Sequence, residues 1–417
     1  MDKSVCWGRV KGIIAPPSSK SYAQRAIALA LLANGRSELR NIEFCKDTRS
    51  ALKCIEALGA KVEYIDESTI GIHGGMKPLN DTLYVGESGL ATRLFTPIAS
   101  LNRSAITVRG EGTLLYRPMD MMVGPLRELG VTVRDGGGFL PIEVQGPIRG
   151  GEVRVDGSIS SQFITGLLLA LPMAEQDTTL YVDSPVSTPY IDMTIDTASR
   201  FGVQIMYNEG DYSTFFIEGN QQYTPCELSI EGDWSGASTM LVAGAIAGEV
   251  TVKNISTLSK QADTAICRAL ERAGAGLIIE QDSVTATKRE LRGFEFDATN
   301  SPDLFPALAA LAAAAEGESV IIGTERLRHK ESDRAQTIYE EYTKLGIEVD
   351  ISQPNIMKIH GGEIHPATTF SHDDHRIAMS LAVSALRCQG EVVIENAECV
   401  EKSYPTFFED LESIIVG

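Results

Sequence analysis

Basic residues recur in this chain where helices are expected to begin. Lys20 and Arg25 lie at the start of one apolar run, Arg93 lies one turn into a second, and His375-Arg376 open another. A cation at a helix N-terminus opposes the helix dipole and costs about 0.3–1 kcal/mol. Because the N–H groups of a helix start attract anions, the repeated arrangement predicts a site for an anionic ligand.

The elements that position these residues recur with a period of about 70 residues. One mark is a hydrophobic residue, a glycine and a short strand pattern, and its glycines are 71 or 72 residues apart: Gly59, Gly130, Gly202, Gly274 and Gly346. A further 71 residues reach Gly417. Glycine after a helix favours a left-handed C-cap. The second mark, a polar segment before an apolar run, predicts six helix starts, at Lys20, Gly89, Ser161, Asp233, Asp303 and Asp374.

Each unit is therefore expected to contain a helix, a strand, a second helix and two or three strands. Alternating segments such as 131–134, 142–145 and 152–155 have the period-two pattern of strands. The last unit ends early, whereas residues 1–18 form strands with no helix before them, so the N-terminus should supply the missing strands. We predict an α/β (α+β) fold with two domains of three repeats, residues 19–231 and residues 1–18 plus 232–417. An open solenoid is less consistent, since its units span about 20–50 residues.

Composition excludes several classes of function. The net charge of −19 argues against a nucleic-acid partner, because phosphate neutralisation requires a basic surface. The seven cysteines contain no CxxC pair and the histidines have no zinc spacing, so we expect no metal and no disulfide. The apolar run 26–33 is too short to span a bilayer, which predicts a cytoplasmic protein without a membrane partner.

Two segments resemble nucleotide-binding motifs only in part. Residues 17–25 place a lysine and a serine at a helix start, as a P-loop does, but lack its GxxxxGK spacing. Gly110-Glu111-Gly112 lacks the third glycine of a dinucleotide fingerprint and is typical of a turn.

Motifs distributed in order over almost the whole chain resemble the 5-enolpyruvylshikimate-3-phosphate synthase family. They are Ser19-Lys20-Ser21-x-x-x-Arg25, Ser160-Ser161-Gln162, Ser187-x-Pro189-Tyr190, Pro302-Asp303, Lys330-Glu331-Ser332-Asp333-Arg334, Asp374-His375-Arg376 and Lys402-Ser403-Tyr404-Pro405. The resemblance implies two domains of three βαβαββ repeats each, an inside-out α/β barrel, with the active site in the interdomain cleft. It also implies a monomer that needs no cofactor.

The implied substrates are shikimate 3-phosphate and phosphoenolpyruvate. The resemblance assigns shikimate 3-phosphate, mainly in the domain 19–231, to Lys20, Ser21, Arg25, Ser160, Ser161, Gln162, Ser187, Asp303 and Lys330. It assigns phosphoenolpyruvate, whose site the other domain completes, to Lys20, Gly89, Arg117, Gln162, Arg334, Arg376 and Lys402. Enolpyruvyl transfer needs a base for the 5-hydroxyl and an acid for C3, which we assign to Asp303 and to Glu331 or Lys20.

The chain departs from the family pattern near its second helix. The family has Asn-x-Gly-Thr there, whereas this chain has Glu87-Ser88-Gly89-Leu90. We predict a weakened or altered affinity for phosphoenolpyruvate and for the inhibitor glyphosate. Arg326 replaces a family asparagine, and no substrate contact is assigned to it.

Two alternatives remain. UDP-N-acetylglucosamine enolpyruvyl transferase shares the architecture and the donor, but its loop cysteine is absent from the segment 112–118. A non-catalytic repeat protein could bind anions, yet it would have no use for Lys20, Asp303, Glu331, Arg334, Arg376 and Lys402 together.

Overall fold

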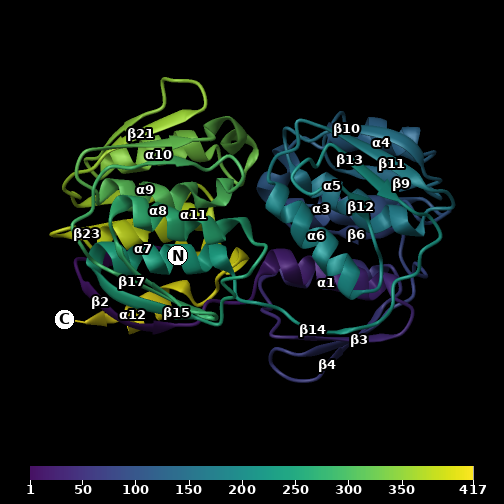
Figure 1. Cartoon of the computed structure of the whole chain (residues 1–417), viewed down its shortest axis with the longest axis horizontal. Coiled ribbons are helices and arrows are strands. Elements are labelled where there is room, and N and C mark those ends of the chain that lie inside the picture. The colour runs from purple at the N-terminus through teal and green to yellow at the C-terminus, as the bar shows by residue number, and fades with distance from the viewer. Residues whose placement is uncertain (417) are drawn as a thin grey trace. The chain divides into compact units, whose positions relative to one another are not determined.

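The computed structural model describes residues 1–416, with His329 described by its backbone alone. The chain divides into two compact units (Figure 1), which are described separately below. Unit 2 contains residues 18–230. Unit 1 contains residues 1–17 together with the chain from residue 231 onward.

The predicted order of elements is confirmed in every repeat. Each of the first five repeats contains helix, strand, helix and three strands, and the sixth ends after its second helix and one short strand. The glycines that end the second helices have positive φ angles of 108° at Gly59, 87° at Gly130, 86° at Gly202, 92° at Gly274 and 85° at Gly346. The left-handed C-cap predicted from the repeat is therefore confirmed at these five positions.

Unit 2 contains three four-stranded sheets of one topology, β14-β3-β5-β4, β6-β7-β9-β8 and β10-β11-β13-β12. In each sheet the first pair is parallel and the other pairs are antiparallel. The strands are β3 (Arg36–Arg40), β4 (Lys61–Tyr64), β5 (Ile70–His73), β6 (Thr82–Tyr84), β7 (Ile106–Arg109), β8 (Thr132–Asp135), β9 (Ile142–Gln145), β10 (Gly151–Asp156), β11 (Thr178–Asp183), β12 (Met206–Tyr207), β13 (Thr214–Ile217) and β14 (Glu227–Ser229). Since β14 pairs with β3, the end of the unit completes its first sheet.

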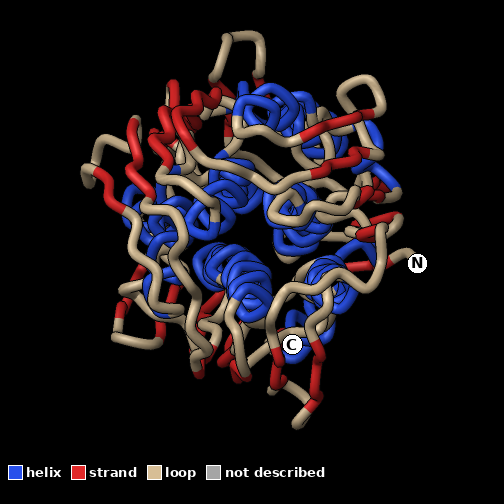
Figure 2. The backbone as a smooth tube through the Cα atoms, turned by 90° about the vertical axis from the view of Figure 1, so that its right-hand side faces the viewer, coloured by secondary structure: helices blue, strands red, loops and turns tan. Residues whose placement is uncertain are grey.

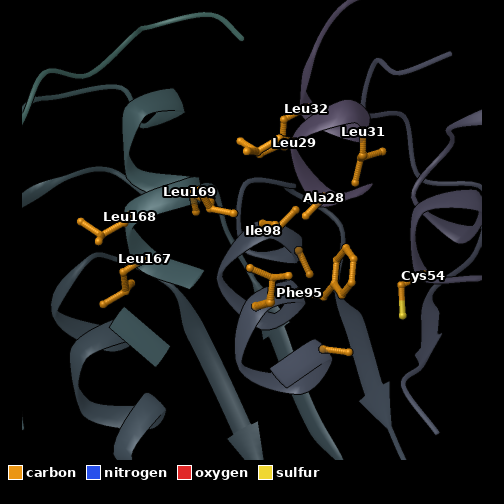
Figure 3. Close-up of a cluster of buried hydrophobic side chains, with 14 of the residues drawn as sticks. Ala28, Leu29, Leu31, Leu32, Cys54, Phe95, Ile98, Leu167, Leu168 and Leu169 are labelled. Atoms are coloured by element: carbon orange, nitrogen blue, oxygen red, sulfur yellow. The ribbon is translucent and has the colours of Figure 1, made fainter. Parts of the chain in front are cut away.

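The helices of unit 2 are of two kinds, which alternate along the chain. They are α1 (Lys20–Leu32), α2 (Lys46–Ala57), α3 (Gly89–Ala99), α4 (Val123–Glu128), α5 (Ser161–Ala170) and α6 (Thr188–Arg200). The first helices of the repeats, α1, α3 and α5, are buried on nearly all sides, as their apolar composition requires. Figure 2 shows the helices of this unit inside and its strands outside. Figure 3 shows their packing, with Leu29, Phe95 and Leu169 among the buried residues.

Unit 1 repeats this architecture with the N-terminal strands included. Its strands are β1 (Lys3–Cys6), β2 (Arg9–Ile14), β15 (Gly248–Lys253), β16 (Gly276–Ile279), β17 (Ser283–Thr287), β18 (Glu295–Asp297), β19 (Glu318–Ile322), β20 (Glu348–Asp350), β21 (Ile356–His360), β22 (Ala367–Phe370), β23 (Glu391–Glu395) and β24 (Ile415–Val416). They form the sheets β16-β17-β15-β2-β24, β18-β19-β21-β20 and β1-β23-β22. β2 runs parallel to β15 and β1 runs antiparallel to β23, so the N-terminus does supply strands to the later repeats, as predicted.

The helices of unit 1 also alternate between buried and half-exposed. They are α7 (Trp234–Ala247), α8 (Ile266–Ala273), α9 (Phe305–Ala313), α10 (Arg334–Lys344), α11 (His375–Ala385) and α12 (Phe407–Ser413). Every residue of α7, α9 and α11 is buried, and α11 packs against both α9 and α7. The predicted mixed α/β fold is thus confirmed. Lys20 lies at the start of the buried helix α1, Arg93 lies one turn into α3, and His375-Arg376 open α11.

Candidate active site

Five of the six predicted helix starts are confirmed to within one residue: α1, α3, α5, α7 and α11. The sixth prediction was wrong by one short turn. Asp303 lies in the 3-10 helix η5 (Pro302–Leu304), and α9 begins only at Phe305. Pro306 has no N–H to offer the preceding turn, which is consistent with a tighter start to this helix.

The cap residues differ between the two units. Serines occupy the N-cap of the buried helices in unit 2, namely Ser19, Ser88 and Ser160. Aspartates cap α7 and α11 in unit 1, where Asp233 accepts from Gly236 N and Asp374 accepts from Arg376 N. A neutral cap leaves the positive end of the helix dipole available to an anion, whereas an aspartate neutralises it. Unit 2 therefore has the better intrinsic anion sites.

In unit 2, Lys20 is held by a carboxylate that sequence analysis missed. Its Nζ lies 3.1 Å from Asp47 Oδ2, and both side chains are largely buried. Asp47 lies in the first turn of α2, where an acidic residue is ordinary, so its sequence position gave no signal of this pairing.

Arg25 is buried and surrounded by hydrogen-bond acceptors of its own unit. Its guanidinium donates to Thr194 Oγ1 at 2.9 Å, Ser21 O at 2.8 Å, Thr165 Oγ1 at 3.1 Å and Tyr190 O at 3.2 Å. Burial is the main reason that its pKa falls to about 10. These four bonds connect α1, α5 and α6, so Arg25 fixes the relative positions of the helices that carry the serine motifs.

The glycine at the start of α3 allows an arginine to approach the backbone. A Cβ atom added at Gly89 would lie 2.7 Å from Arg117 Nη1. Arg93, for which no substrate contact was predicted, donates to Gln162 Oε1 at 2.9 Å and to Pro118 O at 3.1 Å. Gly89, Arg117 and Gln162 are thereby brought together within unit 2, with Arg93 linking them.

The serines of unit 2 have local structural roles as well. Ser160 Oγ accepts from Gln162 N at 3.2 Å and caps α5. Ser161, the first residue of that helix, is buried. Ser187, also buried, precedes α6 in a left-handed conformation with φ 54° and ψ 40°, which is costly for a residue other than glycine. Such strain is often found at functional sites.

In unit 1, one arginine connects the predicted carboxylates. The Arg334 guanidinium lies 2.6 Å from Asp303 Oδ1, 2.8 Å from Glu331 Oε2 and 2.7 Å from Asp374 Oδ2. The Arg334 side chain is completely buried. In the sequence, Asp374 is recognisable as a helix start and as part of the Asp374-His375-Arg376 motif, and its role in orienting Arg334 became apparent only in the structure.

Three cationic side chains lie around the Asp303 carboxylate. Besides Arg334, Lys330 Nζ lies 3.3 Å from Oδ1 and Arg376 Nη2 lies 3.7 Å from Oδ2. Burial would raise the pKa of Asp303, but the charges of Lys330, Arg376 and Arg334 hold it well below its usual range. Burial lowers the pKa of Lys330, an effect that Asp303 partly opposes. Asp303 is thus an ionised carboxylate in a site that is rich in cations.

The remaining predicted residues occupy the same unit. Lys402 is buried at the end of the 3-10 helix η7 (Ala397–Lys402), and Arg376 is buried in the first turn of α11. Arg326, which replaces a family asparagine, donates to Thr299 O at 2.5 Å. Unit 1 therefore gathers Asp303, Lys330, Glu331, Arg334 and Arg376, with Lys402 near a helix end of the last repeat.

Outside this cluster, Glu340, Glu341 and His372 bring three potential metal-ligating atoms within 4.8 Å of one another. The Glu341 carboxylate already accepts from His372 Nε2 at 2.7 Å, from Lys344 and from the Phe370 amide. This arrangement is a satisfied buried carboxylate, which connects α10 to the segment before α11.

Comparison with known proteins identifies the family of the chain. The family model described as EPSP synthase (3-phosphoshikimate 1-carboxyvinyltransferase) matches residues 7–411. The chain belongs to this family. A 3-phosphoshikimate 1-carboxyvinyltransferase of Clostridium perfringens is 37% identical, over 97% of this chain and 96% of that protein. One of Methanosarcina acetivorans is 38% identical, over 99% of this chain and 98% of that protein.

Solved structures show the same fold. EPSP synthase from Acinetobacter baumannii has a TM-score of 0.85 and 26% sequence identity, covering 99% of this chain and 98% of that one. The enolpyruvyl transferase NikO from Streptomyces tendae has a TM-score of 0.77 at 18% identity, covering 99% of this chain and 96% of that one. Among the described residues, no helix has the length and apolar character needed to cross a membrane.

Proposed function

We propose that this chain transfers the enolpyruvyl group of phosphoenolpyruvate to the 5-hydroxyl of shikimate 3-phosphate and releases inorganic phosphate. Membership of the family supports the reaction, and the Arg334 cluster is the structural observation that carries it. Two anionic substrates must be held despite their mutual repulsion, which requires buried, oriented cations. The carboxylates that hold those cations are also groups that could transfer protons.

The proposed reaction has an addition step and an elimination step. The 5-oxygen attacks C2 of phosphoenolpyruvate while its proton passes to Asp303, and a proton from Glu331 or Lys20 adds to C3. The tetrahedral product then loses phosphate as the bond from C2 to the phosphate oxygen breaks. In the same step a proton returns from C3 to the group that delivered it, Glu331 or Lys20, and the double bond is restored.

Asp303 would become more basic when substrates bind. Its pKa is held low by three cations, which makes it a weak base in the empty protein. If phosphoenolpyruvate engages Arg334 and Arg376, their charges are shared with the substrate, and the pKa of Asp303 should rise toward the operating pH. Binding would thereby prepare the base at the moment it is needed.

The proposed substrate contacts follow the sequence predictions. Shikimate 3-phosphate would be held by Lys20, Ser21, Arg25, Ser160, Ser161, Gln162, Ser187, Asp303 and Lys330. Phosphoenolpyruvate would be held by Lys20, Gly89, Arg117, Gln162, Arg334, Arg376 and Lys402. The serine-capped helices of unit 2 support a main role for residues 19–231 in binding shikimate 3-phosphate. The single remaining N–H of Arg25 beyond its four described bonds limits it to one contact.

Phosphate release tests this proposal. The full chain is incubated with phosphoenolpyruvate and either shikimate 3-phosphate or UDP-N-acetylglucosamine, and released phosphate is measured. We expect release with shikimate 3-phosphate alone, and a decrease of about 10²-fold or more in Asp303→Asn. Asp282→Asn, an exposed aspartate of the same unit, is the matched control and should retain activity. Release with the sugar nucleotide would favour the alternative acceptor, and release with neither would favour a non-catalytic protein. The cytoplasmic location and the monomeric state remain predictions.

A further inference from the structure

Asp263 is a buried carboxyl that the reaction described above does not use. It lies in the 3-10 helix η4 (Ala262–Ala265) and is 1% exposed. Oδ2 accepts a hydrogen bond from the hydroxyl of Ser235 in the first turn of α7. Oδ1 is buried and makes no hydrogen bond to the part of the chain that the structure describes. Because a buried, unsatisfied oxygen on a charged carboxylate is costly, this geometry favours a bound proton.

The η4 helix is fixed to the start of α7 by Gln261. The Gln261 amide donates to Gly232 O at 2.9 Å and to Glu231 Oε1 at 2.6 Å, and its oxygen accepts from Trp234 N at 3.0 Å. These bonds fix the side chain of Gln261, which lies two positions before Asp263. The carboxyl of Asp263 is therefore held beside the α7 N-terminus.

Charged groups from three helix starts act on Asp263. Burial is the largest cause of the shift and raises the pKa of Asp263. The charges of Asp303 and Asp233 also raise it, and Arg376 lowers it, so that the pKa of Asp263 is about 7. The effect is reciprocal, since Asp303, Asp263 and Asp233 all raise the pKa of Arg376. The helix α8 also contacts η4. The charged side chains of α8 are exposed to solvent: Arg268, Glu271 and Arg272.

We propose that Asp263 is a positioning residue for Arg376. A proton-bearing Asp263 leaves Arg376 available to Asp303 and phosphoenolpyruvate, whereas an ionised Asp263 draws Arg376 away from them. This inference rests on the proposed function, since it takes Arg376 as a phosphoenolpyruvate ligand. A bound anion beside Arg376 disfavours a second negative charge nearby, so substrate binding and protonation of Asp263 favour each other.

The first test compares the pH dependence of KM for phosphoenolpyruvate in the full chain and in Asp263→Asn, at saturating shikimate 3-phosphate. Asparagine has nearly the same shape and cannot ionise. Relative to the variant, KM of the wild type should rise up to about tenfold between about pH 6 and about pH 8, with kcat changed by less than about twofold. Because both proteins experience the same titration of the substrates, the ratio isolates Asp263. A ratio that is constant within about twofold overturns the proposal.

For Ser235→Ala, the proposal predicts the direction in which the pH dependence of KM should shift. The Ser235 hydroxyl donates to the Asp263 carboxylate and lowers its pKa, so its removal should move the midpoint of the KM rise to higher pH. A role in packing alone would change KM or stability without moving the midpoint. An unchanged midpoint, or one at lower pH, contradicts the proposal.

Thermal unfolding without substrates distinguishes this inference from the proposed function. An aspartate whose pKa is raised by folding favours the folded state below its unfolded pKa, and this contribution is lost as pH rises through the folded value. The wild type should therefore lose Tm relative to Asp263→Asn between about pH 4.5 and about pH 8. Equal pH dependence in the two proteins overturns the assignment of a proton to Asp263. If shikimate 3-phosphate gives no phosphate release in the wild type, the proposed function fails, but this measurement still decides the protonation of Asp263.

Discussion

Arg334→Lys should destabilise unit 1 although it conserves the charge. Arg334 makes contacts of 2.6 to 2.8 Å with Asp303, Glu331 and Asp374 from complete burial. A lysine ammonium has no planar fork and can replace one of the three contacts well. With two charge-assisted hydrogen bonds lost at about 1.5 kcal/mol or more each, the expected cost is about 3 kcal/mol. This lies at the lower end of the range of about 3–5 kcal/mol for breaking a buried ion pair.

Urea unfolding followed by tryptophan fluorescence measures this cost. Both tryptophans, Trp7 and Trp234, belong to unit 1, so the fluorescence reports on the unit that contains Arg334. Arg328→Lys is the matched control because Arg328 is 77% exposed and lies 3.8 Å from Asp333. An exposed pair contributes about 0–1 kcal/mol, and this substitution should change the free energy of unfolding by less than about 0.5 kcal/mol.

The pH dependence provides a second criterion. Burial opposes the ionisation of Asp303, but Lys330, Arg376 and Arg334 hold its pKa well below its usual range. Such a group stabilises the fold above its unfolded pKa, and this stability is lost as pH falls through the lower folded value. The difference between wild type and Arg334→Lys should therefore narrow below about pH 4. A variant within about 0.5 kcal/mol of wild type at neutral pH, or a difference that does not narrow in acid, would refute the reasoning.

Three further predictions concern other positions. Gly89→Ala should raise KM for phosphoenolpyruvate about tenfold with little effect on shikimate 3-phosphate, since its Cβ would lie 2.7 Å from Arg117 Nη1; unchanged steady-state kinetics would contradict this. Glu87→Gln should lower the inhibition constant of glyphosate by about threefold, because it removes a carboxylate near the predicted site; an equal or higher constant would contradict it. Glu341→Gln should cost about 2 kcal/mol at neutral pH in urea unfolding, since its pKa is lowered by His372, Lys344 and the Phe370 amide against the opposing effect of burial. That cost should narrow as pH falls below the usual pKa of a glutamate toward the lowered pKa of Glu341, and a cost that does not change with pH would contradict it.

The amino-acid sequence was sufficient to predict the repeat and five of the six starts of the buried helices. Gly130 and Gly202, for example, end helices in the left-handed conformation that their position predicted. Ser160 and Asp374 cap the helices that their residue types predicted. These features depend on the backbone within one turn, where the residue type alone decides which conformation is least costly.

The tertiary structure alone decided which side chains meet. Asp47 lies 27 positions from Lys20, and Asp374 lies 40 positions from Arg334, at helix turns that look ordinary in the sequence. Arg25 was predicted as a ligand for an anion, yet most of its N–H groups bond to its own unit. The sequence position of Asp263 predicts neither its burial nor its contact with Ser235. Long-range pairing depends on how helices pack. The pKa of a carboxyl depends on its burial and on neighbouring charges, and neither can be derived from the pattern of residues along the chain.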